Sequence, residues 1–116
     1  MAKRATYKAP NVPDSQVTPE FVRDQLLMCF ESANGEFMEM MKQPVTSEQL
    51  KQQVRQFVTG VFSNCGVSFD NPSKSGITTA IEQCKSNAEA MMGPAGAEVI
   101  KHHYREMSKL VERLPE

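Results

Sequence analysis

The apolar residues of this chain recur every three or four positions in four separate stretches, and no stretch alternates apolar and polar residues over the length of a strand. A repeat of three to four residues places apolar side chains on one face of an α-helix, whereas strict alternation is typical of a half-buried strand. Proline, glycine or capping residues bound the four stretches. We therefore expect an all-α fold of four amphipathic helices.

The first helix is expected to begin after Thr18 and to run up to Pro44. Thr18 is a favourable N-cap, and Pro19 fits the first helical position, where a backbone N–H would have no partner within the helix. Asn34-Gly35 is also a turn signal, so a break there is the alternative. We favour a continuous helix because the apolar face keeps its register across these two residues.

The second helix has a start signal and a stop signal that agree. Thr46 and Gln49 have the spacing of a capping box, in which each side chain satisfies a free backbone N–H. Gly66 follows the apolar stripe where a left-handed residue ends many helices, and Val67 can then contact Phe62. This pattern predicts a helix that is capped by Thr46, carries its apolar stripe to Cys65 and stops at Gly66.

Two further helices are expected on either side of Gly93-Pro94. The third follows a loop over residues 67–75, where Asn71-Pro72 or Ser75 could cap it. The fourth runs from Pro94 or Gly96 to Leu114. Short connections make neighbouring helices antiparallel, so residues 18–116 are predicted to form one antiparallel four-helix bundle with up-down-up-down topology. Residues 1–17 contain two prolines and no helical period, which indicates a flexible N-terminal arm.

Composition narrows the functional classes. Lys and Arg number 13 against 14 Asp and Glu, so the chain lacks the basic excess of a typical nucleic-acid binder. No apolar run is long enough for a membrane span, and none follows Lys3 and Arg4 as a signal peptide requires. We expect a cytoplasmic protein in which Cys29, Cys65 and Cys84 are reduced and pack as small apolar residues.

The chain offers few groups for catalysis, and we predict neither an enzyme nor a cofactor. Its two histidines are adjacent, so on a helix they point about 100° apart and cannot serve one site. His103 falls on the apolar face, where we expect it at the edge of the core with one nitrogen hydrogen-bonded. Glu98, His102 and Glu106 share the polar face, and a ligand- or metal-binding bundle using these three residues of the fourth helix is the alternative function.

Nucleic-acid binding through the N-terminal arm and a stripe of basic residues on the fourth helix is a third possibility. The stripe consists of Lys101, Arg105, Lys109 and Arg113. Glutamates are interleaved with it, which is the usual composition of a solvated, ion-paired helix face. No aromatic residue accompanies it for base stacking, so nucleic acid is the least favoured partner.

The outer faces of the two middle helices carry polar but uncharged or small residues, whereas soluble monomers usually place Lys and Glu there. These residues are Gln52, Gln56, Thr59, Ser63, Thr79, Ser86 and Ala90, with Phe21 and Met28 on the first helix as secondary anchors. We predict that they form an interaction surface for a protein partner or for a second copy in a homodimer. The sequence therefore favours a small accessory or self-associating module. Met40, Met41, Met91 and Met92 could form an adaptable binding surface, but we favour the core for them because they lie on or beside the apolar stripes.

Overall fold

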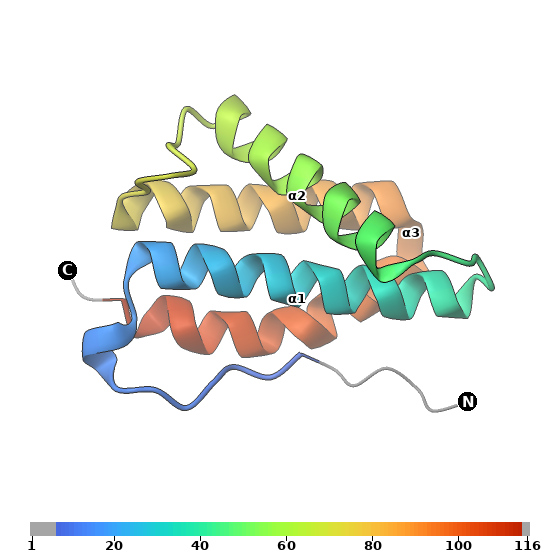
Figure 1. Cartoon of the computed structure of the whole chain (residues 1–116), viewed down its shortest axis with the longest axis horizontal. Coiled ribbons are helices and arrows are strands. Elements are labelled where there is room, and N and C mark those ends of the chain that lie inside the picture. Colours follow the sequence, from blue (N-terminus) through green and yellow to red (C-terminus); the bar gives the residue numbers. More distant parts are fainter. Residues whose placement is uncertain (1–6, 115–116) are drawn as a thin grey trace.

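The computed structural model describes residues 7–114, and this part of the chain contains three α-helices and no strand. Helix α1 spans Pro19–Met40, α2 spans Ser47–Asn64 and α3 spans Lys74–Glu112, after a short 3-10 helix, η1, at Asp14–Gln16 (Figure 1). The expected all-α class is confirmed. No described helix combines the length and the apolar character needed to cross a bilayer.

The predicted four-helix bundle is not supported, because the third and fourth expected helices form one kinked element, α3. Only Gly93 leaves helical geometry, with φ 76° and ψ −173°. Pro94 follows it and starts the second arm, where its missing N–H costs nothing. The two arms, residues 74–92 and 94–112, fold back on each other (Figure 1). Tyr104 in the second arm donates a hydrogen bond to the Ile81 carbonyl in the first.

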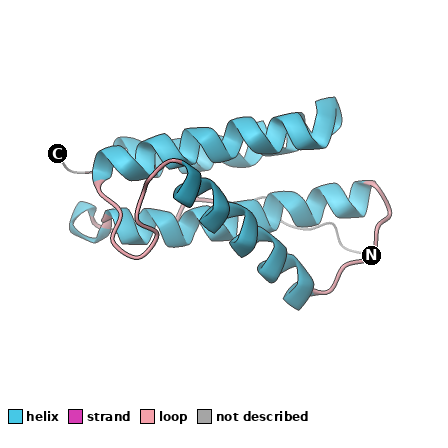
Figure 2. Cartoon of the chain, turned by 90° about the horizontal axis from the view of Figure 1, so that it is seen from above, coloured by secondary structure: helices cyan, strands magenta, loops and turns pink. Residues whose placement is uncertain are grey.

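Helix α2 departs from the regular packing of a bundle, because it crosses the other helices obliquely (Figure 2). Two ring contacts hold its C-terminal half against different parts of the chain. Phe57 packs against Phe30 of α1 with ring centroids 5.9 Å apart, and Phe62 packs against Phe69 of the following loop at 5.4 Å. Arg23 of α1 fixes that loop, since its Nη1 donates to the Phe69 carbonyl at 2.7 Å.

The local signals at the helix ends are largely confirmed. Thr18 caps α1, the Thr46–Gln49 capping box forms at α2, and Gly66 has φ 71° at the end of α2. Helix α1 continues through Asn34-Gly35, as favoured, and ends at Met40. The cap of α3 was not anticipated, because Ser73 accepts the hydrogen bond from the Gly76 N–H.

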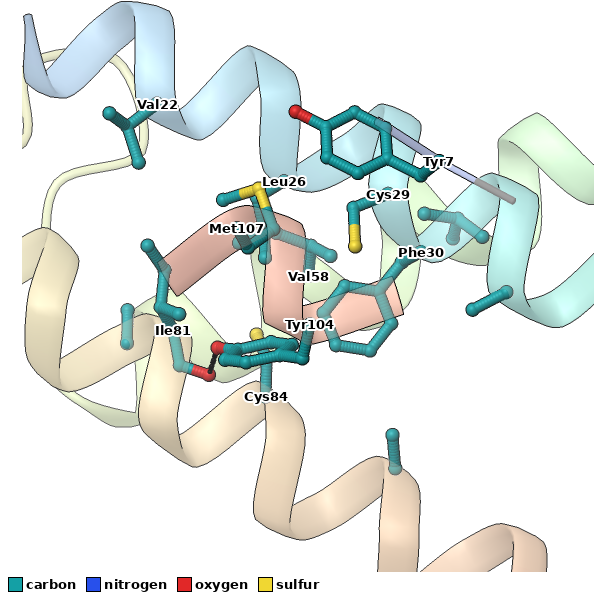
Figure 3. Packing of buried hydrophobic residues seen from close by; sticks show 14 of the residues in the cluster. Tyr7, Val22, Leu26, Cys29, Phe30, Val58, Ile81, Cys84, Tyr104 and Met107 are labelled. Carbon is teal, nitrogen blue, oxygen red and sulfur yellow. Dashed lines mark hydrogen bonds between the residues drawn. The ribbon is translucent and has the colours of Figure 1, made fainter. Parts of the chain in front are cut away.

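The core lies where α1, α2 and both arms of α3 meet (Figure 3). Leu26 and Phe30 of α1, Val58 of α2 and Ile81 and Met107 of α3 are almost completely buried there. Cys29 and Cys84 are buried in the same core, and Cys65 is half-buried at the end of α2. His103 is 1% exposed, which is deeper than the expected core edge.

Residues 7–17 lie against the helices. Tyr7 is buried and its hydroxyl donates to Gln25 Oε1 of α1 at 2.7 Å. The Ala9 N–H donates to Glu106 Oε1 of α3 at 3.0 Å, and Val17 is fully buried. The flexibility of the N-terminal arm stays a prediction, and its residues Lys3 and Arg4 lie outside the described residues.

Candidate functional site

A groove of about 180 Å³ opens where α2 crosses the end of the first arm of α3. It is lined by Asn34 of α1, by Gln53, Val54 and Phe57 of α2, and by Ala88, Met91 and Met92 of α3. Val54 and Ala88 are buried, and the Phe57 ring rests on Phe30. The groove therefore has a fixed apolar floor and an adaptable wall of methionine.

No residue that lines the groove is charged. The nearby cations of the same two helices contact aromatic rings elsewhere. Arg55 lies over the Phe69 ring at 5.2 Å, and Lys85 lies over the Tyr104 ring at 5.8 Å. Lys85 also pairs with Glu89 at 3.7 Å. The groove is thus suited to an uncharged, apolar occupant.

Met91 is the most exposed large apolar side chain at this site. It is 76% exposed, although it also lines the groove. Met40 and Met41, at the end of α1, are each more than half exposed as well. The expectation that these three methionines fill the core is wrong. The apolar stripes of α1 and of the first arm of α3 extend beyond the part of each helix that another helix covers. Only Met92 packs partly against the core.

The residues predicted for the interaction surface fall on two differently oriented faces. On α2, Gln52, Gln56 and Ser63 are exposed, and the half-buried Thr59 donates its hydroxyl to the Arg55 carbonyl at 2.8 Å. On α3, Thr79, Ser86 and Ala90 are exposed. At about 100° per residue, however, Thr79 and Ser86 lie on nearly the opposite side of α3 from Ala88, which faces α2. Their role in binding stays a prediction.

The secondary anchors lie away from the groove. Phe21 and Met28 share one side of α1, with Met28 55% exposed and Phe21 partly packed against the core. Asn34, which faces the groove, is about 120° around the helix from Met28. Phe21 and Met28 therefore belong to a separate surface.

The structure does not assemble the residues of the metal-binding alternative. Among the described residues no group of three His, Cys, Asp or Glu side chains is placed to hold a metal ion. Glu98 and His102 are exposed, whereas Glu106 has both carboxylate oxygens engaged, Oε1 by the Ala9 N–H and Oε2 by Lys109 Nζ at 2.7 Å. The hydrogen bond from Lys109 is the main cause that lowers the pKa of Glu106.

The buried cysteine thiols and tyrosine hydroxyls of the core are held in their protonated, neutral forms. Burial raises the pKa of the Cys29 and Cys84 thiols to about 12. Burial also raises the pKa of the Tyr7 and Tyr104 hydroxyls. A thiol reacts as a thiolate, so Cys29 and Cys84 are poor nucleophiles at neutral pH.

Comparison with protein-family models, with curated proteins and with solved structures gives no match. The functional argument therefore depends on the groove itself. Sequence reasoning placed Met91 and Met92 on or beside apolar stripes and missed that, together with Phe57, they line an opening. The only signal was Gly93-Pro94, which ends the first arm of α3 close to these methionines. The oblique crossing of α2, which leaves the groove open, has no signature in the sequence.

Proposed function

We propose that this chain is a non-catalytic helical module that works through protein contact, with the outer face of α2 and the adjoining groove as its contact surface. The observation that carries the proposal is the groove, which combines an apolar floor, methionine in its wall and no charged lining residue. Methionine-rich surfaces adapt to apolar side chains of a partner, because the thioether side chain is unbranched and polarizable.

The outer face of α2 extends this surface beside the groove. Gln52, Gln56 and Ser63 are exposed on it, and they can exchange hydrogen bonds with water for hydrogen bonds with a partner. Protein interfaces are depleted of Lys, Glu and Asp at their centres, and Gln52, Gln56 and Ser63 form an uncharged strip with Glu48 and Arg55 at its border. Such a strip costs less to desolvate than a helix face that is charged throughout.

The proposal is tested with the double variant Gln52→Glu, Gln56→Glu. Glutamate has nearly the shape of glutamine, and both positions are exposed, so the fold should persist while the face gains two negative charges. We expect light scattering of the wild type over a wide concentration range to show a mass above 13.0 kDa, and the double variant to stay closer to that value. Circular dichroism checks that the helix content is unchanged.

Ser86→Asp places a charge among the predicted interaction residues of α3, which lie on another face, and tests whether they belong to the contact surface. If it lowers association as much as the α2 variant, the contact surface is wider than the α2 face. The proposal is wrong if the wild type remains at 13.0 kDa and the α2 charges leave the recovery of proteins from a native lysate unchanged.

A further inference from the structure

We infer that the occupant of the groove is Met91 of a second copy of this chain, inserted reciprocally across a two-fold axis. This inference depends on the proposed function, because it names the partner at the same contact surface. Three features of the groove support it: its size, the position of Met91 and the distribution of charge.

The groove has the capacity for a single large apolar side chain. Its volume is about 180 Å³, whereas an apolar cavity of about 150 Å³ is enough to hold one benzene molecule. The floor of Val54, Phe57 and Ala88 offers only apolar surface to such a side chain. A polar group placed on this floor would lose its hydrogen bonds to water, and only Asn34 and Gln53 of the lining have side chains that could replace them.

Met91 is a side chain of that kind at the edge of the same groove. It is 76% exposed in the single chain, so most of its apolar surface is available to another molecule. In an isologous dimer the same patch occurs on both subunits, and a group that contacts a second group is contacted by it in return. Met91 protrudes beside a groove of matching size and so allows such a reciprocal contact. A two-fold axis that places Met91 of one copy in the groove of the other also places the second Met91 in the first groove.

The charge distribution makes the surface compatible with a copy of itself. A two-fold interface brings equivalent parts of the two copies together, so a face with one sign of charge would repel its own copy. No groove residue is charged, and Arg55 and Lys85 contact Phe69 and Tyr104 outside the groove. Gln83 and Asn87, on the neighbouring turns of α3, bond to each other at 2.7 Å and add no charge. The groove itself therefore brings no like charges together, and the neighbouring Lys85 and Glu89 have opposite signs and pair with each other at 3.7 Å.

Two variants separate the inserted side chain from the groove that receives it. Met91→Ala removes the inserted side chain and, because Met91 also lines the groove, widens the groove without filling it. Gln53→Trp places a large ring at the wall of the groove and leaves Met91 in place. Both positions are exposed, so neither change disturbs the core. We expect each variant alone to dimerise at least tenfold more weakly than the wild type in sedimentation equilibrium, as for a residue at the centre of an interface.

Mixing the two variants is the decisive measurement. A mixed dimer can insert Met91 of the Gln53→Trp chain into the open groove of the Met91→Ala chain, so it retains one of the two contacts. We expect the mixture to associate more strongly than either variant alone. Met28→Ala is the control, because Met28 is an exposed methionine on another surface, and this variant should dimerise like the wild type.

The outcomes distinguish this inference from the proposed function. If the wild type associates and the Gln52→Glu, Gln56→Glu variant weakens association, but Met91→Ala and Gln53→Trp behave like the wild type, the contact surface stands and reciprocal insertion is wrong. Equal weakening by Met28→Ala, or no recovery in the mixture, also overturns it. A wild type that stays monomeric at the highest concentration excludes the second copy as the occupant.

Discussion

At the scale of single residues, His103 shows how a polar side chain becomes part of this core. Its Nδ1 lies 2.9 Å from the Val99 carbonyl, and its Nε2 lies 3.2 Å from the Ser32 hydroxyl. A carbonyl oxygen only accepts, so Nδ1 carries a proton and donates it to Val99, while Nε2 contacts the Ser32 hydroxyl. The sequence predicted one bonded nitrogen. The second bond depends on α1 lying beside the second arm of α3, which no local pattern specifies.

The adjacent histidines provide a matched test of this interpretation. His103→Ala should lower the free energy of unfolding by about 2–4 kcal/mol, the usual cost of a cavity left by a large buried side chain. His102→Ala should change it by less than about 0.5 kcal/mol, because His102 is exposed. Urea unfolding followed by circular dichroism measures both values. Equal effects of the two substitutions would contradict the assignment of His103 to the core.

At the scale of elements, the sharpest feature is the reversal of α3 at one residue. The Gly93 conformation, φ 76° and ψ −173°, belongs to a region that residues with a Cβ essentially never adopt. A Cβ at Gly93 would meet no atom within 4 Å, so the cost of adding one is backbone strain and not a clash. Gly60, in the middle of α2, also has open space around its position but has helical geometry.

The same substitution should therefore have opposite effects at these two glycines. Gly93→Ala should destabilise the fold by about 1–3 kcal/mol through strain at the reversal. Gly60→Ala should stabilise it by about 0.5–1 kcal/mol, because alanine restricts the unfolded chain and favours the helix. Thermal unfolding at a concentration below any self-association measures both. A Gly93→Ala variant as stable as the wild type would show that the reversal does not require glycine.

The helices were more predictable from the sequence than their arrangement was. Thr46, Gln49 and Gly66 specify the ends of α2 through hydrogen bonds within a few residues, and such short-range signals can be read directly. Asn34-Gly35 also reads as a turn, yet it lies within α1, where Gly35 is buried against neighbouring structure. The groove was not predictable, because it depends on the crossing of α2 over α3. The exposure of Met91 follows from that crossing and not from its position on an apolar stripe.

At the scale of the whole molecule, the buried thiols and tyrosine hydroxyls make the stability of the fold fall at alkaline pH. The thiols of an unfolded chain ionise near pH 8.5, whereas burial raises the pKa of Cys29 and Cys84 to about 12 in the native protein. The native state keeps protons that the unfolded state releases, so the stabilisation is complete below about pH 8.5 and is lost as the pH rises toward 12. Tyr7 and Tyr104 act in the same direction at higher pH, because burial also raises their pKa.

Unfolding in urea at a series of pH values should therefore give a stability that is flat near pH 7 to 8 and then falls. Each buried thiol contributes a slope of about 1.4 kcal/mol per pH unit between the two pKa values. The double variant Cys29→Ala, Cys84→Ala should start from a lower stability but fall less steeply between pH 9 and 10, because it has no buried thiol to ionise. Parallel pH profiles for the variant and the wild type would show that the thiols ionise without unfolding the core. That result would require water to reach the region between α1 and the first arm of α3, where both thiols are buried.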